Sequence, residues 1–498
     1  MDGDMPAGFY DLQVDVVDAT RNPVQNARSH IKVEVRVVPE IAFQNHATIR
    51  LEYNADTPID SFSFLYEPEG EKSRLTRFKE YMERLLREDK CQVDVFSIKK
   101  SEAILQTSYK EVIDIRFTVQ TEKGFLSPVL LNGLLAQYQS DIEQEIDARI
   151  LGVGIDMCKL THCDNGCQTV NRADTFGVMV DANNTAIVGV NASAHDECSC
   201  PVFLPPSSCD VDVCYNDGVC HNTYPGTFCE CRNSNLNGFR CQGNTRSFNG
   251  AGFAWFKPMP ACTSLNISLN FMTREDGLLL YNGPMRRTDK AEQKDVLNYQ
   301  DFLSIYIKDG MPMVDLQFNG QATVELKINS IVTDGRFHQL TLSQQHKNLE
   351  FVLDECATLT SDVNDASECR IFKIAPDDDE RLNIVTPLQL GGLAPLPTGV
   401  DYPEFVSGKK SLNGCIRKLV VNNDHYDLYN PVHYKNSVEG CSSYWGNACQ
   451  VSSADATSNS VSASNNYCLN GECYAEVENA VPNVFVTLDM LVTVASVK

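Results

Sequence analysis

Residues 209–241 read CDVDVCYNDGVCHNTYPGTFCECRNSNLNGFRC, and this short stretch holds six cysteines spaced C-x4-C-x5-C-x8-C-x-C-x9-C. Six cysteines in 33 residues leave too few apolar side chains for a conventional core, so cross-links must hold the stretch together. Spacing alone permits about fifteen pairings of six cysteines. The stretch is therefore predicted to be a small disulfide-held module whose pairing the spacing leaves open.

The composition indicates a protein that works outside the cell. Twenty cysteines in 498 residues, clustered at short spacings, fit an oxidising compartment in which disulfides persist. Three N-glycosylation sequons, beginning at Asn183, Asn191 and Asn266, agree with that setting. The net charge of −24 argues against binding nucleic acid or docking electrostatically on an anionic membrane. With 43% apolar residues, the chain is expected to form several domains, each with its own core.

On the C-terminal side, residues 243–441 alternate apolar and polar positions in many short runs, with almost no helical periodicity. The clearest runs are residues 265–271, 278–281, 302–307, 313–318 and 339–342. Roughly 190 residues of such strands, separated by polar turns, predict a single β-sandwich.

Two segments of the cysteine stretch, Cys214-Tyr-Asn-Asp-Gly-Val-Cys220 and Cys229-Glu-Cys231, closely resemble EGF-like modules, and we assign residues 205–242 to one. The resemblance implies the disulfides Cys209–Cys220, Cys214–Cys229 and Cys231–Cys241. Calcium-binding members of that family carry acidic residues just before the first cysteine, whereas this chain has Pro-Pro-Ser-Ser at 205–208. Asn222 stands at the position of the family's hydroxylated ligand. Without those acids we expect a structural role for Asn222 and no calcium in this module.

The strand-rich region resembles laminin G and neurexin-type modules in five motifs. These are Ser-Phe-Asn-Gly at 247–250, Thr-Arg-Glu-Asp-Gly-Leu-Leu-Leu-Tyr at 273–281, Asp-Gly-Arg-Phe-His at 334–338, Pro-Leu-Gln-Leu-Gly-Gly at 387–392 and Asn-Gly-Cys-Ile at 413–416. The resemblance implies a jelly-roll β-sandwich closed by a Cys415–Cys441 disulfide. It also implies a Ca²⁺ site at the rim, formed by Asp301 before one strand and Asn383 on a facing loop, with modest affinity because only one ligand is charged. Ordinary loop positions are the alternative for both residues.

On the N-terminal side, residues 41–157 mix strands and helices. Strands are predicted at 46–53, 93–98, 112–119 and 150–155, and helices at 73–90 and from Ser127-Pro128 to about residue 147. The order βαββαβ predicts a ferredoxin-like α+β domain. In an extracellular protein this layout resembles SEA-type domains. The connection 101–110 lacks the Gly-Ser pair at which some of them cleave themselves, so we do not expect self-cleavage.

Residues 158–204 form a cysteine-rich region around two predicted strands at 175–180 and 186–190. Its five cysteines, at positions 158, 163, 167, 198 and 200, make six with Cys91, enough for three disulfides. His162 and His195 suggest a zinc site as an alternative, but the spacings fit zinc fingers poorly, so disulfides are favoured. Cys356 and Cys369 are expected to bridge one loop, whereas the pairing of Cys262 and of the cysteines at 449, 468 and 473 is left open.

Both ends of the chain resemble parts of larger modules. Alternating runs at 10–17 and 31–38 predict a β-hairpin that resembles the last two strands of a cadherin repeat within residues 1–40. Asp18 stands at the place of that family's calcium-ligating aspartate, with an ordinary turn residue as the alternative. Residues 442–498 combine a Ser/Asn/Ala-rich linker with a pattern similar to the first half of an EGF-like module. Since the sequence has neither a signal peptide nor an apolar span of about 18 residues, we expect an internal fragment or an incomplete gene product rather than a cytosolic protein.

The order of these parts resembles the membrane-proximal ectodomain of invertebrate epithelial-type cadherins. That resemblance implies calcium-dependent, mainly homophilic cell–cell adhesion at adherens junctions of the plasma membrane. It also implies catenins bound by a cytoplasmic tail outside this chain, and membrane contact only through a missing transmembrane segment. Within that family this block would act in spacing and folding of the ectodomain.

Two other functions are alternatives to adhesion. One is a matrix or synaptic receptor whose laminin G module binds a protein or glycan. The other is an enzyme, but the sequence has no Gly-x-Ser-x-Gly, no His-Glu-x-x-His and no glycine-rich phosphate loop. We therefore do not expect an enzyme.

Overall fold

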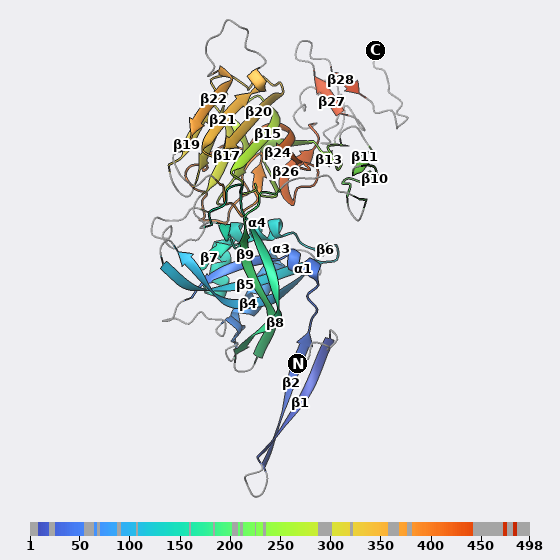
Figure 1. Ribbon diagram of the computed structural model, residues 1–498, viewed down its shortest axis with the longest axis vertical. Helices are drawn as coiled ribbons and strands as arrows, with labels where there is room; N and C mark the ends of the chain where they lie inside the picture. The colour runs from blue at the N-terminus through green and yellow to red at the C-terminus, as the bar shows by residue number, and fades with distance from the viewer. Residues whose placement is uncertain are drawn as a thin grey trace, which may run out of the picture.

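The chain builds two bodies stacked end to end, with a β-hairpin extending from the lower one (Figure 1). The computed structural model describes residues 8–441 except 19–24, 54–63, 67–69, 87–90, 106–107, 159–160, 183–184, 202–207, 210–212, 225, 233–235, 287–300, 319–321, 357–367 and 376–380, together with 472–475 and 482–485. Most regular structure in this part is β. None of its helices has the length and apolar character needed to cross a membrane.

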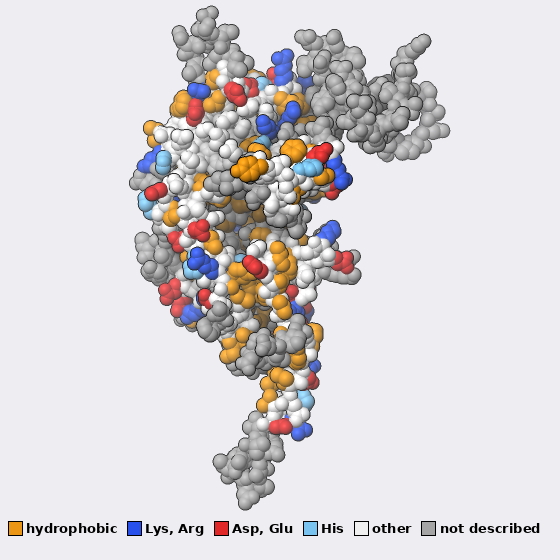
Figure 2. Space-filling view, turned by 45° about the vertical axis from the view of Figure 1, so that its right-hand side comes forward, with side chains coloured by type: hydrophobic (Ala, Val, Ile, Leu, Met, Phe, Trp, Pro, Cys, Tyr) orange, Lys and Arg blue, Asp and Glu red, His pale blue; other side chains and the backbone are white. Residues whose placement is uncertain are grey.

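The predicted N-terminal hairpin is present. Its strands β1 (Gly8–Asp18) and β2 (Gln25–Val35) are antiparallel, and Leu12 lies opposite Ile31. Alternation places Leu12, Val14 and Ile31 on one face, where 36%, 39% and 48% of their surface is exposed. Hydrophobic side chains are visible between charged ones on this hairpin (Figure 2). A two-stranded ribbon is at best marginally stable by itself, so this apolar face needs a partner.

Residues 41–157, which we call the mixed domain, contain one antiparallel sheet with helices beside it. The elements are α1 (Glu40–Gln44), β3 (Ala47–Glu52), α3 (Arg74–Leu86), β4 (Gln92–Leu105), β5 (Ser108–Thr121), β6 (Gly124–Phe125), α4 (Pro128–Gln137), α5 (Gln139–Ile146) and β7 (Ile150–Val153). The strands lie in the order β4-β5-β3-β7, every neighbouring pair antiparallel, and β6 pairs with β5. The predicted sequence of strand, helix, two strands, helix and strand is confirmed.

The helices follow their sequence signals. Helix α3 buries Leu75, Phe78 and Met82, which recur at the three- to four-residue spacing of one helix face. Helix α4 begins after Ser127, whose side chain accepts a hydrogen bond from the Leu130 backbone N–H at 3.2 Å. The single helix predicted from 128 to 147 is instead two helices. Tyr138, with φ −108° and ψ 21°, leaves helical geometry between α4 and α5.

Strands β4 and β5 are longer than predicted. The expected polar connection 101–110 belongs mostly to them, since Ser101 pairs with Val112 and Leu105 with Ser108. Glu102 on this extension is exposed. Residues 101–110, Ser-Glu-Ala-Ile-Leu-Gln-Thr-Ser-Tyr-Lys, do not alternate apolar and polar positions, so the pattern that locates strands in a sequence is absent from this stretch.

A buried ion pair crosses the centre of this sheet. Arg50 on β3 donates from Nε and Nη2 to the two carboxylate oxygens of Asp114 on β5, at 2.6 and 2.8 Å. Arg50 is 8% exposed and Asp114 1% exposed. The buried guanidinium of Arg116 lies two residues further along β5, and the desolvation caused by burial lowers its pKa. Asp114 is thus the charge that compensates this cationic part of the sheet.

The cysteine-rich region forms a second hairpin that lies across strand β4. Its strands, β8 (Gln168–Ala182) and β9 (Thr185–Glu197), extend well beyond the predicted 175–180 and 186–190. At Gly189 a Cβ atom would collide with the Phe96 carbonyl oxygen of β4, so only glycine permits this close approach.

Residues 243–441, which we call the C-terminal sandwich, form the upper body, and the predicted β-sandwich is confirmed. Its elements are β14 (Thr245–Phe256), β15 (Ser264–Thr273), β16 (Gly277–Asn282), β17 (Phe302–Lys308), β18 (Met311–Gln317), β19 (Val324–Lys327), β20 (His338–Gln345), β21 (Asn348–Leu353), the short 3-10 helix η3 (Asp354–Cys356), β22 (Arg370–Ile374), β23 (Leu388–Leu390), β24 (Asn413–Val421), β25 (Asp424–His425) and β26 (His433–Glu439). The hydrogen-bonded path runs β19-β18-β17-β16-β23-β14-β24-β15-β20-β21-β22. Its end strands β19 and β22 contact each other, so the path folds back over a buried aliphatic and aromatic core.

Three small ribbons complete the described structure. Strands β10 (Val219–Asn222) and β11 (Thr227–Glu230) pair within the cysteine stretch, and β12 (Leu236–Asn237) pairs with β13 (Gln242–Gly243) at its end. Strands β27 (Glu472–Ala475) and β28 (Pro482–Phe485) pair near the C-terminus. The half EGF-like pattern expected in residues 442–498 otherwise lies outside the described residues.

The buried ion pair predicts a large stability effect. Replacing Asp114 by Asn should lower the free energy of unfolding of the mixed domain by about 3–5 kcal/mol, because Arg50 and Arg116 then remain buried without a counter-charge. Glu80→Gln on α3 is the matched control within the same domain. It breaks an ion pair with Lys72 whose side chains are 44% and 59% exposed, so it should cost under about 1 kcal/mol. Urea denaturation measures both, and equal losses would contradict the assignment.

Candidate functional site

Asp301 and Asn383 lie together at one edge of the C-terminal sandwich. Asp301 immediately precedes β17, is 4% exposed, and its Oδ2 accepts a hydrogen bond from the Asn383 backbone N–H at 2.9 Å. The side-chain Oδ1 of Asn383 is buried and has no hydrogen-bond partner within the described part of the chain. Calcium binds hard oxygen ligands, including carboxylates and amide carbonyls. A carboxylate beside a buried amide oxygen that no described residue donates to is therefore a pair that fits calcium.

Asp18, the third predicted calcium ligand, lies elsewhere. It is the last residue of β1, and its backbone is opposite Gln25 of β2 in the N-terminal hairpin. That hairpin extends from the far end of the lower body, away from the sandwich (Figure 1). The structure therefore does not bring Asp18 to Asp301 and Asn383, so any site at Asp18 is separate.

The edge that carries Asn383 faces the mixed domain. A cavity of about 550 Å³ lies between them, lined by Asn132 of α4, by the segment from Asn383 to Val385 and by Met259 of the sandwich. Arg381, 7% exposed, donates from Nη2 to the carbonyl oxygen of Thr161 at 2.7 Å. Residues 381–390, which we call the rim segment, are thus contacted directly by the part of the chain that precedes the EGF-like stretch.

Helix α4 and the sandwich share an apolar contact. A Cβ atom built on Gly133 would lie 2.5 Å from the ring of Trp255 and 2.6 Å from Pro387, so the helix backbone lies directly on these side chains. Trp255 is fully buried and donates from Nε1 to Oε1 of Gln389 at 3.2 Å. The buried cluster around it joins residues of both bodies: Leu134, Ala136, Phe253, Trp255, Leu278, Tyr281, Met285, Phe302, Tyr306, Met313, Ala394, Tyr402 and Val406.

Polar contacts flank this apolar junction. Gln137, at the end of α4, donates from Nε2 to the carbonyl oxygen of Pro395 at 2.5 Å. Arg286 of the sandwich donates to a carboxylate oxygen of Glu143 in α5 at 3.1 Å, and both side chains are about four-fifths buried. These contacts fix the orientation of the two bodies around the apolar cluster.

Disulfides fasten the cysteine-rich region internally and to the sandwich. The pairs are Cys158–Cys167, Cys163–Cys198 and Cys200–Cys262. The expectation that Cys91 completes the set is wrong, because Cys200 pairs with Cys262 at the start of the sandwich. An isolated antiparallel β-bridge outside the strands brings Gly166 beside Cys262, so the partner of Cys200 is set by tertiary contact. The thiols of the alternative zinc site are consumed by these bonds.

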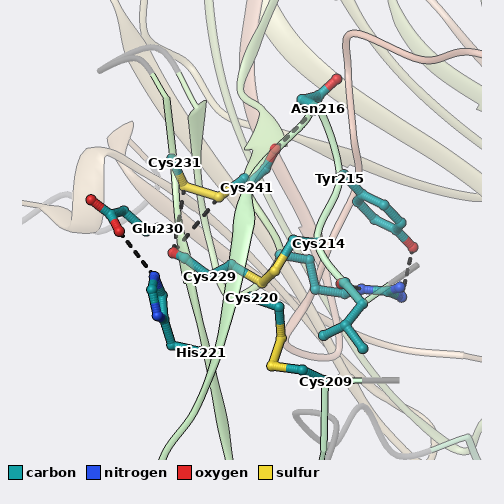
Figure 3. Close-up of a disulfide and its surroundings, with 12 residues drawn as sticks. Cys209, Cys214, Tyr215, Asn216, Cys220, His221, Cys229, Glu230, Cys231 and Cys241 are labelled. Atoms are coloured by element: carbon teal, nitrogen blue, oxygen red, sulfur yellow. Dashed lines mark hydrogen bonds and ion pairs between the residues drawn. A yellow bond between two sulfur atoms is a disulfide. The ribbon is translucent and has the colours of Figure 1, made fainter. Parts of the chain in front are cut away.

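The cysteine stretch is held by Cys209–Cys220, Cys214–Cys229 and Cys231–Cys241, the three pairs that the EGF-like resemblance implies (Figure 3). Asn222 uses its Oδ1 to accept a hydrogen bond from the Cys209 backbone N–H at 2.8 Å, a structural role. The guanidinium of Arg240 lies over the Tyr215 ring, 4.1 Å from its centroid, and donates to its hydroxyl at 2.7 Å. The cysteine cluster at 214, 220 and 229 has its thiols in these disulfides, so it offers no metal ligands.

Asp427 fixes this module to the sandwich. Its Oδ1 accepts from the backbone N–H of Gly243 at 2.7 Å, and its Oδ2 accepts from the Asn216 amide at 3.2 Å and the Asn430 amide at 2.7 Å. Asn430 also donates to Oδ1 of Asn216 at 2.8 Å. One carboxylate therefore joins the module, the linker strand β13 and the sandwich.

The two disulfides predicted within the sandwich are present, and a charged cluster lies beside one of them. Cys415 pairs with Cys441, and Cys356 with Cys369. Next to the latter, His338 contacts Asp354 through Nδ1 at 2.8 Å and Asp334 through Nε2 at 3.1 Å, with its side chain 13% exposed. Only the imidazolium can donate from both ring nitrogens. These hydrogen bonds, with that to Asp354 first, raise the pKa of His338 despite its burial.

The described sequon asparagines differ in their surroundings, and Asn183 lies outside the described residues. The amide of Asn191 donates from Nδ2 to Asp174 at 2.8 Å and accepts from Lys99 at 2.8 Å. Asn266, on β15, has an exposed side chain. Only Asn266 of these two therefore presents an amide that can carry a glycan without displacing an observed contact.

Sequence reasoning missed the residues that join the modules. Asn132, Gly133, Arg381 and Asp427 contact partners far along the chain, and the apolar periodicity of one element says nothing about these. One feature of the sequence does indicate such a contact. Gly133 interrupts a strongly apolar helical pattern, and such a glycine usually has a packing reason.

Comparisons with known proteins identify two domains. Residues 40–194 match a family described as DE-cadherin, Ig-like domain, and residues 271–424 match the laminin G domain family. The chain is 44% identical over 483 residues to Cadherin-related hmr-1 of Caenorhabditis elegans, covering 96% of this chain and 16% of that protein. It is 31% identical over 451 residues to Neural-cadherin of Drosophila melanogaster, covering 87% of this chain and 14% of that protein. The chain thus spans about a sixth or less of the length of these relatives.

Solved structures with a partial likeness include laminin fragments. The LG1-3 region of the laminin alpha2 chain matches 41% of this chain and 35% of that chain, with a TM-score of 0.32 and 20% identity. Domains LG4-5 of the mouse laminin alpha1 chain match 41% of this chain and 48% of that chain, with a TM-score of 0.30 and 14% identity.

The His338 cluster predicts a pH dependence of sandwich stability. Because the folded-state pKa of His338 is raised, its stabilisation is complete below the unfolded pKa of about 6.5 and is lost as pH rises through the folded pKa. Burial raises the pKa of Asp334 and Asp354, but hydrogen bonds outweigh it and lower both, so their stabilisation is lost as pH falls through the folded pKa. His338→Gln should cost about 1–3 kcal/mol at pH 6 and flatten the pH dependence between 6 and 9. Thermal melts across that range measure it, and an unchanged slope would contradict the role.

Glycan attachment should follow the exposure of the asparagines. In secreted protein, Asn266→Gln should lose one glycan, seen as a mass shift that enzymatic deglycosylation of wild type reproduces. Asn191→Gln should leave the mass of the deglycosylation-sensitive fraction unchanged, because its amide is held by Asp174 and Lys99. A glycan mapped to Asn191 by peptide mass spectrometry would contradict this expectation.

Proposed function

This chain carries an Ig-like DE-cadherin domain followed by a laminin G domain, as part of an invertebrate-type cadherin ectodomain, and we propose that it serves calcium-dependent, mainly homophilic cell–cell adhesion as a structural spacer. The observation that carries the proposal is 44% identity to a cadherin-related protein over 96% of the chain. The relatives named above are cadherins, which are cell-adhesion proteins. Catalysis is no part of the proposed role.

We assign residues 1–40 to the end of a cadherin repeat. The support is the hairpin β1–β2, whose apolar face carries Leu12, Val14 and Ile31 with nothing in the described chain to cover it. In a β-sandwich such a face packs against the second sheet. Asp18 at the end of β1 keeps its proposed role as a calcium ligand within that repeat.

We assign residues 41–157 to a ferredoxin-like domain and residues 205–242 to an EGF-like module. The first assignment is supported by the strand order β4-β5-β3-β7 and by the helices α3, α4 and α5, which an all-β immunoglobulin sandwich lacks. The second is supported by the three disulfides of the cysteine stretch. Residues 158–204 are the cysteine-rich hairpin, 243–441 the laminin G module, and 442–498 a linker with a partial EGF-like segment.

The spacer role is supported by the way the modules are joined. Apolar packing of α4 on Trp255, the disulfide Cys200–Cys262 and the carboxylate of Asp427 each connect modules across a boundary. Inter-domain interfaces that are large and hydrophobic restrict relative motion. A stiff block of this kind is suited to hold distal adhesive repeats away from a membrane rather than to bind a partner itself.

Localisation and partners follow from the relatives and belong to the whole protein. We propose the extracellular side of the plasma membrane at cell–cell junctions, the same cadherin on a neighbouring cell as partner, and catenins on a cytoplasmic tail beyond this chain. We propose Ca²⁺ as the bound ion, with Asp301 and Asn383 as its position in the laminin G module. The fit of that pair rests on the buried Asn383 oxygen, which lies beside the Asp301 carboxylate and receives no hydrogen bond from any residue that the structure describes.

A matrix or synaptic receptor that uses its laminin G rim to bind ligand is the second candidate. The observation against it is that Asn383 and its neighbours line the junction with the mixed domain, and that Arg381 donates to the carbonyl oxygen of Thr161 in the adjoining cysteine-rich region. An external protein or glycan would have to displace that contact.

Aggregation assays test the proposed function. Cells expressing the parent cadherin should aggregate with each other in millimolar calcium, separate in EDTA, and sort away from non-expressing cells. Beads coated with this chain alone should stay dispersed, because the chain acts as a spacer.

Two outcomes would contradict parts of this proposal. Calcium-independent binding to heparin or matrix without self-aggregation of the expressing cells would favour the receptor function. Aggregation of beads that carry only this chain would place the adhesive surface within it and end the spacer assignment.

A further inference from the structure

We propose that calcium at the laminin G rim fastens the mixed domain to the sandwich, so that calcium binding and the docking of the two bodies strengthen each other. The inference rests on the proposed calcium role of Asp301 and Asn383. It adds that the rim is an inter-module site rather than a surface for an external ligand.

The first support is the position of the rim. The segment from Asn383 to Val385 lines the same cavity as Pro128, Val129 and Asn132 of α4. A Cβ atom built on Gly154, just after β7, would lie 3.4 Å from Val385 and 3.6 Å from the Asn132 amide. The mixed domain therefore lies so close to the chain that carries the calcium position that a single added methyl group would touch it.

The second support is the set of oxygen atoms at this junction. Asn383 Oδ1 and Asn132 Oδ1 are both buried, and neither has a hydrogen-bond partner in the described part of the chain. One comes from the sandwich and the other from α4. Buried polar atoms are nearly always satisfied, so two such oxygens beside one cavity need an ion or water. The buried carboxylate of Asp301, whose Oδ2 accepts a hydrogen bond from the Asn383 backbone N–H, adds a charged oxygen beside Asn383, and calcium prefers hard oxygen ligands of this kind.

The third support is that docking itself positions the rim. Pro387, four residues beyond Asn383, packs against α4 at Gly133, and Arg381, two residues before it, donates to the Thr161 carbonyl oxygen. The rim segment is thus held on both sides by the preceding region. If docking fixes the ligand geometry, linkage requires that calcium stabilise docking by the same factor.

The test uses the full chain, calcium chloride titrated calorimetrically, and hydrogen exchange measured with and without calcium. In wild type, calcium should slow exchange both in the rim segment 381–390 and across the junction in 128–137 and 155–158. Asp301→Asn should abolish binding at this site and the protection on both sides.

Gly133→Leu tests the coupling without touching a calcium ligand. Leucine is a better helix former than glycine, so α4 should persist, while its side chain meets Trp255 and Pro387 and displaces the helix from the sandwich. Calcium affinity should fall at least about threefold, the scale of a modest coupling. Gly133→Ala, a smaller wedge, should give an intermediate loss. Arg370→Gln, which breaks an exposed pair with Glu350 on β21, is the control and should bind calcium like wild type.

Three results would overturn the inference. They are unchanged affinity in both Gly133 variants, calcium protection confined to the sandwich in wild type, and normal binding by Asp301→Asn. The wild-type exchange measurement decides the matter even if a variant fails to fold. None of these results bears on cell aggregation by the parent cadherin, so failure here and failure of the proposed adhesion function remain distinguishable.

Discussion

The close approach of helix α4 to the C-terminal sandwich at Gly133 is the constraint on which the arrangement of this molecule depends. Because position 133 has no side chain, the helix backbone lies directly on Trp255 and Pro387, and a common apolar cluster forms across two bodies that would otherwise be separate. Burial of Trp255 then fixes Gln389, which receives its indole N–H. The laminin G module therefore shares part of its core with the preceding domain, and its rim is presented to that domain.

The cysteine stretch and the cysteine-rich hairpin are too small to share a large apolar core with their neighbours, and they are joined to them mainly by disulfides and hydrogen bonds. The cysteine stretch has too few apolar residues for a core of its own, so its disulfides supply internal order and the Asp427 carboxylate supplies its attachment. The cysteine-rich hairpin is attached in two ways. Gly189 lies against the backbone of β4 in the mixed domain, and the Cys200–Cys262 disulfide joins the hairpin region to the sandwich. Neighbouring modules are thus held by close packing together with hydrogen bonds or a disulfide, and these contacts limit the motion of one module relative to the next.

The sequence predicted well whatever depends on local periodicity or on motif resemblance. Periodicity predicted helix α3 and the β-sandwich, and residue preferences at helix starts predicted the Ser127 cap. Motif resemblance predicted that Asp301 and Asn383 lie close together. It predicted poorly what depends on tertiary contact. Three features have no local signature: the pairing of Cys200 with Cys262, the interruption at Tyr138, and the extension of β4 and β5 through residues 101–110. The Asn132 oxygen belongs to the same class, because a polar residue on an apolar helix gains meaning only once the opposing surface is known.

The Cys200–Cys262 bond has a mechanical consequence. It joins residues 62 apart in sequence and closes a loop that contains the whole cysteine stretch at 209–241. When a force acts along the chain between the N-terminal hairpin and Cys441, tension passes from Cys200 directly to Cys262 through the disulfide. The EGF-like module then carries none of the load along the covalent path. It is a side branch of the force-bearing chain and can keep its fold under tension that stretches its neighbours.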